Sequence, residues 1–169
     1  MHYALWALVT REQAEVKDPH VLVERVVAYF DMGREVEPYD VPCLCLDPTP
    51  QVDCEECNGT GLMEVDYPVD SRFDWFSVGG RWSGRFDGTR AGRNVIPVAE
   101  LEPGMSPSVI VAPDGTWHVN SDLDDGSRNS AEPDAPRTVQ VRAEEWDDLV
   151  ARLLAEHERC LVVVADMHA

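Results

Sequence analysis

The hydrophobic pattern at the start of the chain predicts a strand followed by a helix. Residues 2–9, HYALWALV, are apolar at successive positions, which is typical of a strand that is buried on both faces. Asp18 and Pro19 then supply an N-cap and a first-turn proline. The apolar residues between Val21 and Phe30 follow at helical spacing. A buried strand and an amphipathic helix are therefore expected within the first 30 residues.

The second half of the chain predicts a hairpin, a helix and a last strand. Residues 108–120 read SVIVAP-DG-TWHVN, two apolar runs joined by Asp-Gly, which is a strong hairpin signal. Residues 142–158 carry an apolar stripe opposite acidic side chains, as an amphipathic helix does. Residues 161–165, LVVVA, are typical of a short buried strand. In chain order this gives β-α-β-β-α-β, and we predict an α+β, ferredoxin-like fold with two helices on one face of an antiparallel sheet.

The length of 169 residues predicts one domain, residues 1–169, interrupted by three segments. Residues 40–62 form an inserted loop that carries four cysteines. Residues 71–93 form a second insertion, rich in glycine, tryptophan and arginine. Residues 121–136 are acidic and contain proline, so we expect a flexible loop there.

The cysteine spacing is the strongest chemical signal in the chain. Cys43 and Cys45 form a C-x-C pair, and eight residues later Cys54 and Cys57 form a C-x-x-C pair. Each pair can place two thiolates on one metal ion, and four sulfur ligands leave no open position, which describes a structural zinc site. Free reduced thiols and a redox or iron–sulfur role are the alternatives. The fifth cysteine, Cys160, precedes an apolar run and is interpreted as a small buried hydrophobe.

The second cysteine pair resembles a known zinc-binding unit. Residues 54–61, CEECNGTG, are similar to the C-x-x-C-x-G-x-G repeat of the DnaJ cysteine-rich region. The resemblance implies a zinc knuckle or ribbon. It does not imply chaperone activity, because the chain has no HPD motif of a J-domain.

The charge of the chain argues against several kinds of partner. Fourteen basic residues against thirty-two acidic ones give a net charge of −18. Such a field repels nucleic acids and anionic lipid, so direct nucleic-acid binding is not expected. The acidity either keeps the protein soluble or complements a basic partner. No secretory signal and no run of about 20 apolar residues is visible. With thiolates on zinc, this predicts a cytoplasmic protein without a membrane span.

The segment 71–93 concentrates basic and aromatic residues. Five of the fourteen basic residues lie there, and its centre reads DWFSVGGRWSG from Asp74 to Gly84. Gly79 and Gly80 permit a close backbone approach. Arg81 and Trp82 offer a guanidinium fork and a π face that could grip a phosphate and a base, or a carboxylate. The alternative is that Trp75, Phe76 and Trp82 pack over the sheet while Arg81 pairs with an aspartate.

A group of histidines and carboxylates forms the remaining candidate site. Asp74, His118, Asp166 and His168 could assemble a second metal site or an acid–base pair. Asp166 and His168 point to the same face if they lie in a strand. The alternative is a polar sheet edge with a frayed chain end. The candidate ligand-binding residues are therefore Asp74, Trp75, Arg81, Trp82, His118, Asp166 and His168.

Three phrases of the chain together resemble a protein family. DWFSVGGRWSG, PDGTWH and VVVADMHA are similar to small proteins of actinobacteria, phages and prophages. That family brings no established activity, so the resemblance implies a phage or mobile-element setting. We expect a zinc-stabilised acidic interaction protein that binds a host protein, with a counter-defence role and no catalysis. The alternative is a small-molecule or nucleotide binder, or an enzyme, that uses Asp74, Arg81, Trp82, His118 and His168.

Overall fold

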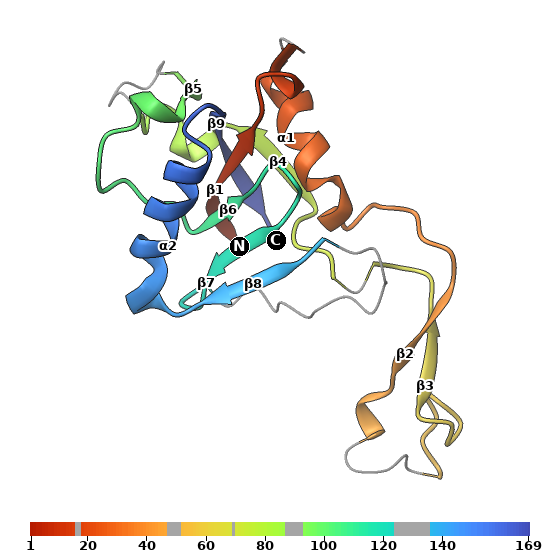
Figure 1. The fold of residues 1–169 in the computed structure, drawn as a ribbon. Coiled ribbons are helices and arrows are strands. Elements are labelled where there is room, and N and C mark those ends of the chain that lie inside the picture. Colours follow the sequence, from red (N-terminus) through yellow and green to blue (C-terminus); the bar gives the residue numbers. More distant parts are fainter. Residues whose placement is uncertain (16–17, 47–51, 69, 87–92, 124–135) are drawn as a thin grey trace.

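The computed structural model describes residues 1–15, 18–46, 52–68, 70–86, 93–123 and 136–169. Within these residues the chain forms a mixed seven-stranded sheet, a separate two-stranded sheet and two α-helices (Figure 1). The elements run in the order β1 (His2–Val9), α1 (Pro19–Val27), β2 (Tyr39–Pro42), β3 (Leu62–Val65), β4 (Trp75–Val78), β5 (Val95–Pro97), β6 (Val109–Val111), β7 (Trp117–Asn120), β8 (Thr138–Val141), α2 (Ala143–Glu156) and β9 (Leu161–His168).

The large sheet is organised around two long strands, β1 and β9. They pair antiparallel over their whole length, from His2 opposite His168 to Val9 opposite Leu161. The order across the sheet is β4-β9-β1-β6-β7-β8, and β5 pairs with the first residues of β9. The β1–β6 and β7–β8 pairs are parallel, while the other pairs are antiparallel. Strands from both ends of the chain therefore form the centre of the sheet.

The two helices cover opposite faces of this sheet (Figure 1). Side chains alternate between faces along a strand. In β1, Tyr3, Leu5, Ala7 and Val9 belong to the hydrophobic cluster that contains the buried face of α1. Trp6 and Leu8 belong to a second cluster, together with the buried face of α2. The central strand is thus buried on both sides.

The predicted ferredoxin-like fold is wrong. The described residues contain nine strands, seven of them in one mixed sheet, rather than a four-stranded antiparallel sheet with two helices on one face. The physical reason lies in β1, whose apolar residues on both faces require cover on both faces. The helix predicted over 142–158, the hairpin around Asp114-Gly115 and the strand 2–9 are all present.

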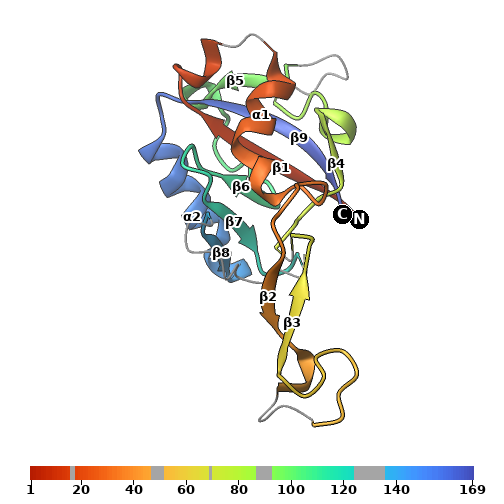
Figure 2. The ribbon, with the colours of Figure 1, turned by 90° about the vertical axis from the view of Figure 1, so that its right-hand side faces the viewer.

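The insertions predicted from the sequence take distinct structural forms. The described residues of the segment 40–62 lie in the β2–β3 hairpin, which projects away from the large sheet in both views (Figures 1 and 2). This projecting hairpin, residues 34–70, is called the arm below. Residues 71–93 supply β4, an edge strand of the large sheet. Most of the predicted flexible loop 121–136 lies outside the described residues.

Charged side chains join the two ends of the arm at its base. Arg34, where the chain enters the arm, lies 3.5 Å from the buried carboxylate of Asp70, where the chain leaves it. The Arg34 guanidinium also lies over the ring of Tyr29, in the short 3-10 helix Ala28–Phe30 that follows α1. Arg72, which is buried, donates a hydrogen bond to Thr138 of β8. These contacts join the base of the arm to the rest of the domain.

Candidate functional site

The arm positions the four cysteines at its tip. Pro42 of β2 pairs with Leu62 of β3, and the next residue, Cys43, donates its N–H to the carbonyl of Gly61 at 2.8 Å. Cys45 lies in a short 3-10 helix, Leu44–Leu46, that directly follows. Cys54 and Cys57 come from the turns that lead back into β3. The hairpin register thus brings the C-x-C pair opposite the C-x-x-C pair.

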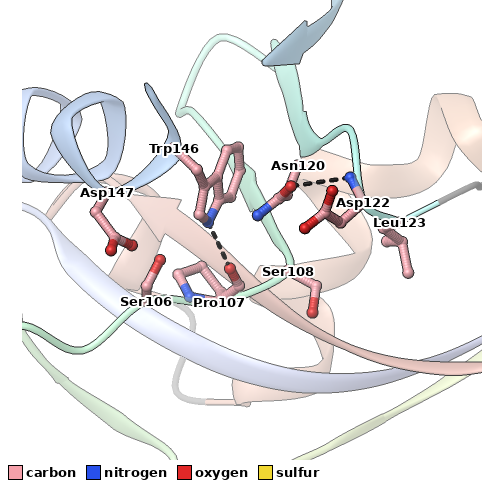
Figure 3. Close-up of a pocket in the computed structure, with 8 residues that line it drawn as sticks. All are labelled: Ser106, Pro107, Ser108, Asn120, Asp122, Leu123, Trp146 and Asp147. Carbon is pink, nitrogen blue, oxygen red and sulfur yellow. Dashed lines mark hydrogen bonds between the residues drawn. The ribbon is translucent and has the colours of Figure 1, made fainter. Parts of the chain in front are cut away.

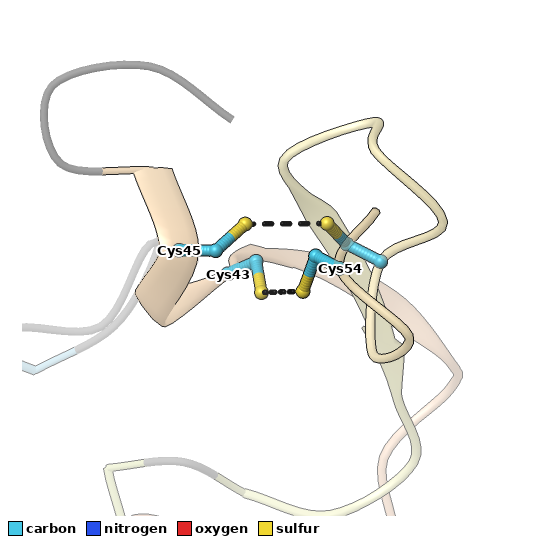
Figure 4. A group of neighbouring side chains, drawn as sticks. Cys43, Cys45 and Cys54 are labelled. Atoms are coloured by element: carbon cyan, nitrogen blue, oxygen red, sulfur yellow. Dashed lines mark hydrogen bonds between the residues drawn. The ribbon is translucent and has the colours of Figure 1, made fainter. Parts of the chain in front are cut away.

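The geometry of the four sulfur atoms suits one metal ion. All four Sγ atoms lie within 4.8 Å of one another. The Sγ atoms of Cys43 and Cys54, both labelled in Figure 4, are 3.7 Å apart. Those of Cys45 and Cys57 are 3.4 Å apart. Four thiolates around a tetrahedral ion with metal–sulfur bonds of about 2.3 Å would be separated by about 3.8 Å. Cys43, Cys45, Cys54 and Cys57 therefore form a group that could bind a metal ion.

The turn after Cys57 depends on left-handed backbone. Asn58, Gly59 and Gly61 all have positive φ, and a Cβ on Gly59 would meet the carbonyl oxygen of Val52 at 2.8 Å. In this conformation the Gly61 N–H donates to Cys57 Sγ at 3.3 Å. Burial raises the pKa of Cys57, but this hydrogen bond and the neighbouring sulfurs outweigh it and lower the pKa to about 7. Cys57 is thereby prepared to act as a thiolate ligand.

A second cluster forms where β1 begins and β9 ends. His2 and His168 face each other across the β1–β9 pair, with ring centroids 4.8 Å apart. His2 Nδ1 lies 3.0 Å from Asp166, and His168 Nδ1 lies 2.8 Å from Asp74. Trp75 stacks on His168 at 5.2 Å. This group of five residues, His2, Asp74, Trp75, Asp166 and His168, is called the histidine cluster below.

The glycine pair of the DWFSVGGRW phrase lets the backbone approach Asp166 closely. Gly79 and Gly80 have positive φ, and a Cβ on Gly80 would lie 2.5 Å from the Cβ of Asp166. Their backbone brings the Arg81 N–H within 3.0 Å of Asp166 Oδ2. Asp166 is only 3% exposed, so this hydrogen bond and the one with His2 account for both carboxylate oxygens. The sequence interpretation of Gly79-Gly80 as a close backbone approach thus corresponds to a specific contact.

The hydrogen bond to His168 also affects Asp74. It stabilises the carboxylate and lowers the pKa of Asp74 below its usual value. Asp74 additionally donates its backbone N–H to the His168 carbonyl at 3.0 Å. Main-chain and side-chain contacts together hold the start of β4 against the end of β9.

The remaining predicted residues lie elsewhere. His118 belongs to β7, which is separated from β9 by β1 and β6, and it is buried opposite Ile110. Burial lowers the pKa of His118. Trp82 packs against the cluster under α2, with the Arg85 guanidinium over its ring at 5.5 Å. The Arg81 side chain is exposed. The contact of Arg81 with the histidine cluster is made by its backbone N–H, which donates to Asp166.

His2 is a member of the cluster that the sequence analysis missed. In sequence it is the polar first residue of an apolar strand, and nothing nearby marks it as functional. Its pairing with His168, at the other end of the chain, is what brings it to Asp166.

A separate hollow lies between the start of α2 and the β6–β7 hairpin (Figure 3). Its volume is about 380 Å³, and Trp146 forms part of its wall while donating Nε1–H to the Pro107 carbonyl at 2.8 Å. None of the residues predicted to bind a metal or ligand lines it.

Comparisons of the chain with protein-family models, curated proteins and solved structures find no match. Among the described residues, no helix combines the length and the apolar character needed to span a membrane. Function is therefore argued from the chemistry of the sites.

Proposed function

We propose that this chain is an interaction protein whose acidic arm, stabilised by a structural zinc ion, docks on a basic surface of a partner protein. The observation that carries the proposal is the meeting of four cysteine sulfurs at the tip of a projecting hairpin. Four thiolates complete a tetrahedral shell and leave no position for a substrate. Cys43, Cys45, Cys54 and Cys57 would hold the ion, which would brace the tip without taking part in catalysis.

The arm needs such a brace. β2 and β3 are four residues each, and within the described part of the chain they pair with each other and with no further strand. An isolated two-stranded hairpin is at best marginally stable in water. Structural zinc sites supply binding free energy on the order of 10 kcal/mol, which is available for folding. A metal ion at the tip would therefore hold the arm in one shape for recognition.

The charge of the arm favours a basic partner. Residues 35–71 contain ten acidic residues and no lysine, arginine or histidine. Exposed examples at the tip are Asp53, Glu55 and Glu56, with Glu64 on β3. Such a one-sided field repels nucleic acids and steers association with positively charged protein surfaces.

The arm also exposes apolar side chains that could anchor a partner. Leu44 is 84% and Val52 is 91% exposed at the tip, while Leu62 and Tyr67 are 48% and 55% exposed along β3 and beyond it. Exposed apolar groups surrounded by charge are typical of protein–protein contact surfaces. We infer that the partner surface combines basic residues with an apolar pocket.

The resemblance of DWFSVGGRWSG, PDGTWH and VVVADMHA to phage and prophage proteins supports a host protein as this partner. In that setting, occupation of a basic functional surface would serve counter-defence.

The metal part of the proposal is tested with Cys54→Ser, which removes one thiolate. We expect Cys54→Ser to contain one zinc ion per chain fewer than the wild type, measured by elemental analysis and native mass spectrometry. Cys160→Ala is the matched control, since Cys160 is buried near α2 and away from the arm. Equal zinc content in Cys54→Ser and in the wild type would contradict the four-thiolate site.

The docking part is tested by comparing two double charge reversals. Glu55→Lys/Glu56→Lys changes the tip, and Asp147→Lys/Asp148→Lys makes the same charge change on the exposed face of α2. Proteins captured from a host lysate by the wild type should include one with a basic surface that is lost with the tip variant and with Leu44→Ser but retained with the α2 variant. Identical capture by all four proteins would reject the arm as the docking element.

A further inference from the structure

The histidine cluster leaves one nitrogen available on each of two neighbouring rings. The Nδ1 atoms of His2 and His168 are both engaged by carboxylates, those of Asp166 and Asp74. Neither Nε2 atom has a hydrogen-bond partner within the part of the chain that the structure describes. A histidine whose second nitrogen is held by a carboxylate is the arrangement that metal-binding histidines usually show, because the carboxylate fixes the tautomer and orients the ring.

The separation of the two rings suits a shared ion. For two imidazoles bound to one ion at about 2.0–2.1 Å, with an angle of about 90–109° between the bonds, the ring centroids are roughly 4.5–5.2 Å apart. The centroids of His2 and His168 are 4.8 Å apart and the rings are inclined at 70°. Their positions directly opposite each other on β1 and β9 set this spacing.

We propose that His2 and His168 bind one divalent first-row transition-metal ion through their Nε2 atoms, with Asp166 and Asp74 as the residues that position the rings. Imidazole nitrogen is a preferred ligand for Zn²⁺ and Ni²⁺. Two nearby carboxylates add negative charge that favours a cation. The site is separate from the cysteine group and does not depend on the function proposed for the arm.

The two histidine rings are positioned by specific contacts with Asp166 and Trp75. Asp166 is buried and its second oxygen accepts the Arg81 N–H, an approach that only glycine at position 80 permits. Trp75 lies parallel to the His168 ring, with an angle of 13° between the planes, and edge-on to His2 at 5.6 Å. Both rings are therefore held from two sides.

Such a site would differ in kind from the cysteine group. Two protein ligands leave coordination positions for water or for an oxygen ligand, as in metal sites that bind substrates. His2 and His168 are partly exposed, at 21% and 34% of their side-chain surface, so the open positions can be reached from solvent.

The test is a zinc titration of the full-length protein followed by native mass spectrometry and isothermal calorimetry. We expect two zinc ions per wild-type chain, one per chain in Cys54→Ser, and one in His2→Ala or His168→Ala. Asp166→Asn should keep the ligands but weaken the second site by roughly 10–100-fold, the usual effect of losing an orienting carboxylate. His157→Ala, at the end of α2, is the matched control and should still bind two ions.

Nuclear magnetic resonance of the wild type gives an independent readout that does not depend on a variant folding. Long-range ¹⁵N–¹H spectra of the histidine rings should show the Nε2 resonances of His2 and His168 shifting together with the second zinc equivalent. The proposal is overturned if no second equivalent binds, or if it binds without moving these two rings. Retention of the second ion in both His2→Ala and His168→Ala would identify it as adventitious binding to the acidic surface.

Discussion

Gly80 packs its backbone against the side chain of Asp166, at a position where a Cβ atom would lie 2.5 Å from the Asp166 Cβ. The same residue has a φ of 48°, which lies in the left-handed region. Both the backbone conformation and the lack of space therefore favour glycine over any other residue at position 80. Its small size is what lets Arg81 donate its N–H to the carboxylate that holds His2.

Gly80→Ala is expected to destabilise the fold more than Gly104→Ala. Gly104 also has positive φ, but a Cβ there meets nothing within 4 Å, so the change costs about 1–2 kcal/mol from conformation alone. Gly80→Ala adds a clash, for which overpacked positions typically cost about 1–3 kcal/mol more. Urea denaturation of the two variants measures the difference, and equal losses would show that the Asp166 contact is not tight.

His118 is the residue from which we expect a pH dependence. Burial lowers the pKa of the folded-state histidine below its unfolded value of 6.5, so the unfolded state binds more protons between the two pKa values. The contribution of His118 to stability is therefore fully present above pH 6.5 and falls as the pH drops toward the folded-state pKa.

The His118→Gln variant isolates this contribution from those of the other histidines. Its free energy of unfolding should decline less steeply than that of the wild type when urea denaturation is repeated at pH values from about 7 to 5. Parallel curves for the two proteins would mean that His118 accepts its proton equally well in both states.

At the level of elements, the arm and the large sheet are separate structures that share one chain. Of the residues in 34–70 that the structure describes, none belongs to either hydrophobic cluster. As far as the structure describes the chain, the strands of the arm pair with each other and with no strand of the large sheet. The base of the arm is joined to the body through Arg34, Asp70 and Arg72. The folding of the sheet should therefore be independent of the cysteine tip.

Replacing residues 43–61 with Asn-Gly tests this independence. Pro42 and Leu62 are directly paired, so a two-residue hairpin turn can join them. We expect the thermal midpoint of the large sheet to stay within about 3 °C of the wild type, because no core contact is lost. Near-ultraviolet circular dichroism reports on this, since all five tryptophans lie outside the replaced segment. A large drop would show that the tip stabilises the body.

At the scale of the whole molecule, charge and apolar surface are distributed unevenly. The large sheet is covered by helices on both faces and contains the two hydrophobic clusters. The arm carries ten of the thirty-two acidic residues and exposes Leu44, Val52, Leu62 and Tyr67. The histidine cluster does not lie on the arm. It lies on the large sheet, where the start of β1 pairs with the end of β9. The histidine cluster and the arm are thus spatially distinct.

The sequence by itself determined features that depend on neighbours along the chain. The cysteine spacing brought four sulfurs together, Asp114-Gly115 made the β6–β7 hairpin, and the stripe over 142–158 became α2. These succeed because turn conformation, side-chain periodicity and short-range spacing are local properties.

Only the tertiary structure decided which distant segments meet. β4 joined the edge of β9, the helices took opposite faces, His2 reached Asp166, and His118 was placed away from the cluster. Strand pairing across more than 150 residues depends on the packing of both sheet faces together, which no local pattern specifies. The apolar residues on both faces of β1 did indicate two covered faces, but not which helix would cover each one.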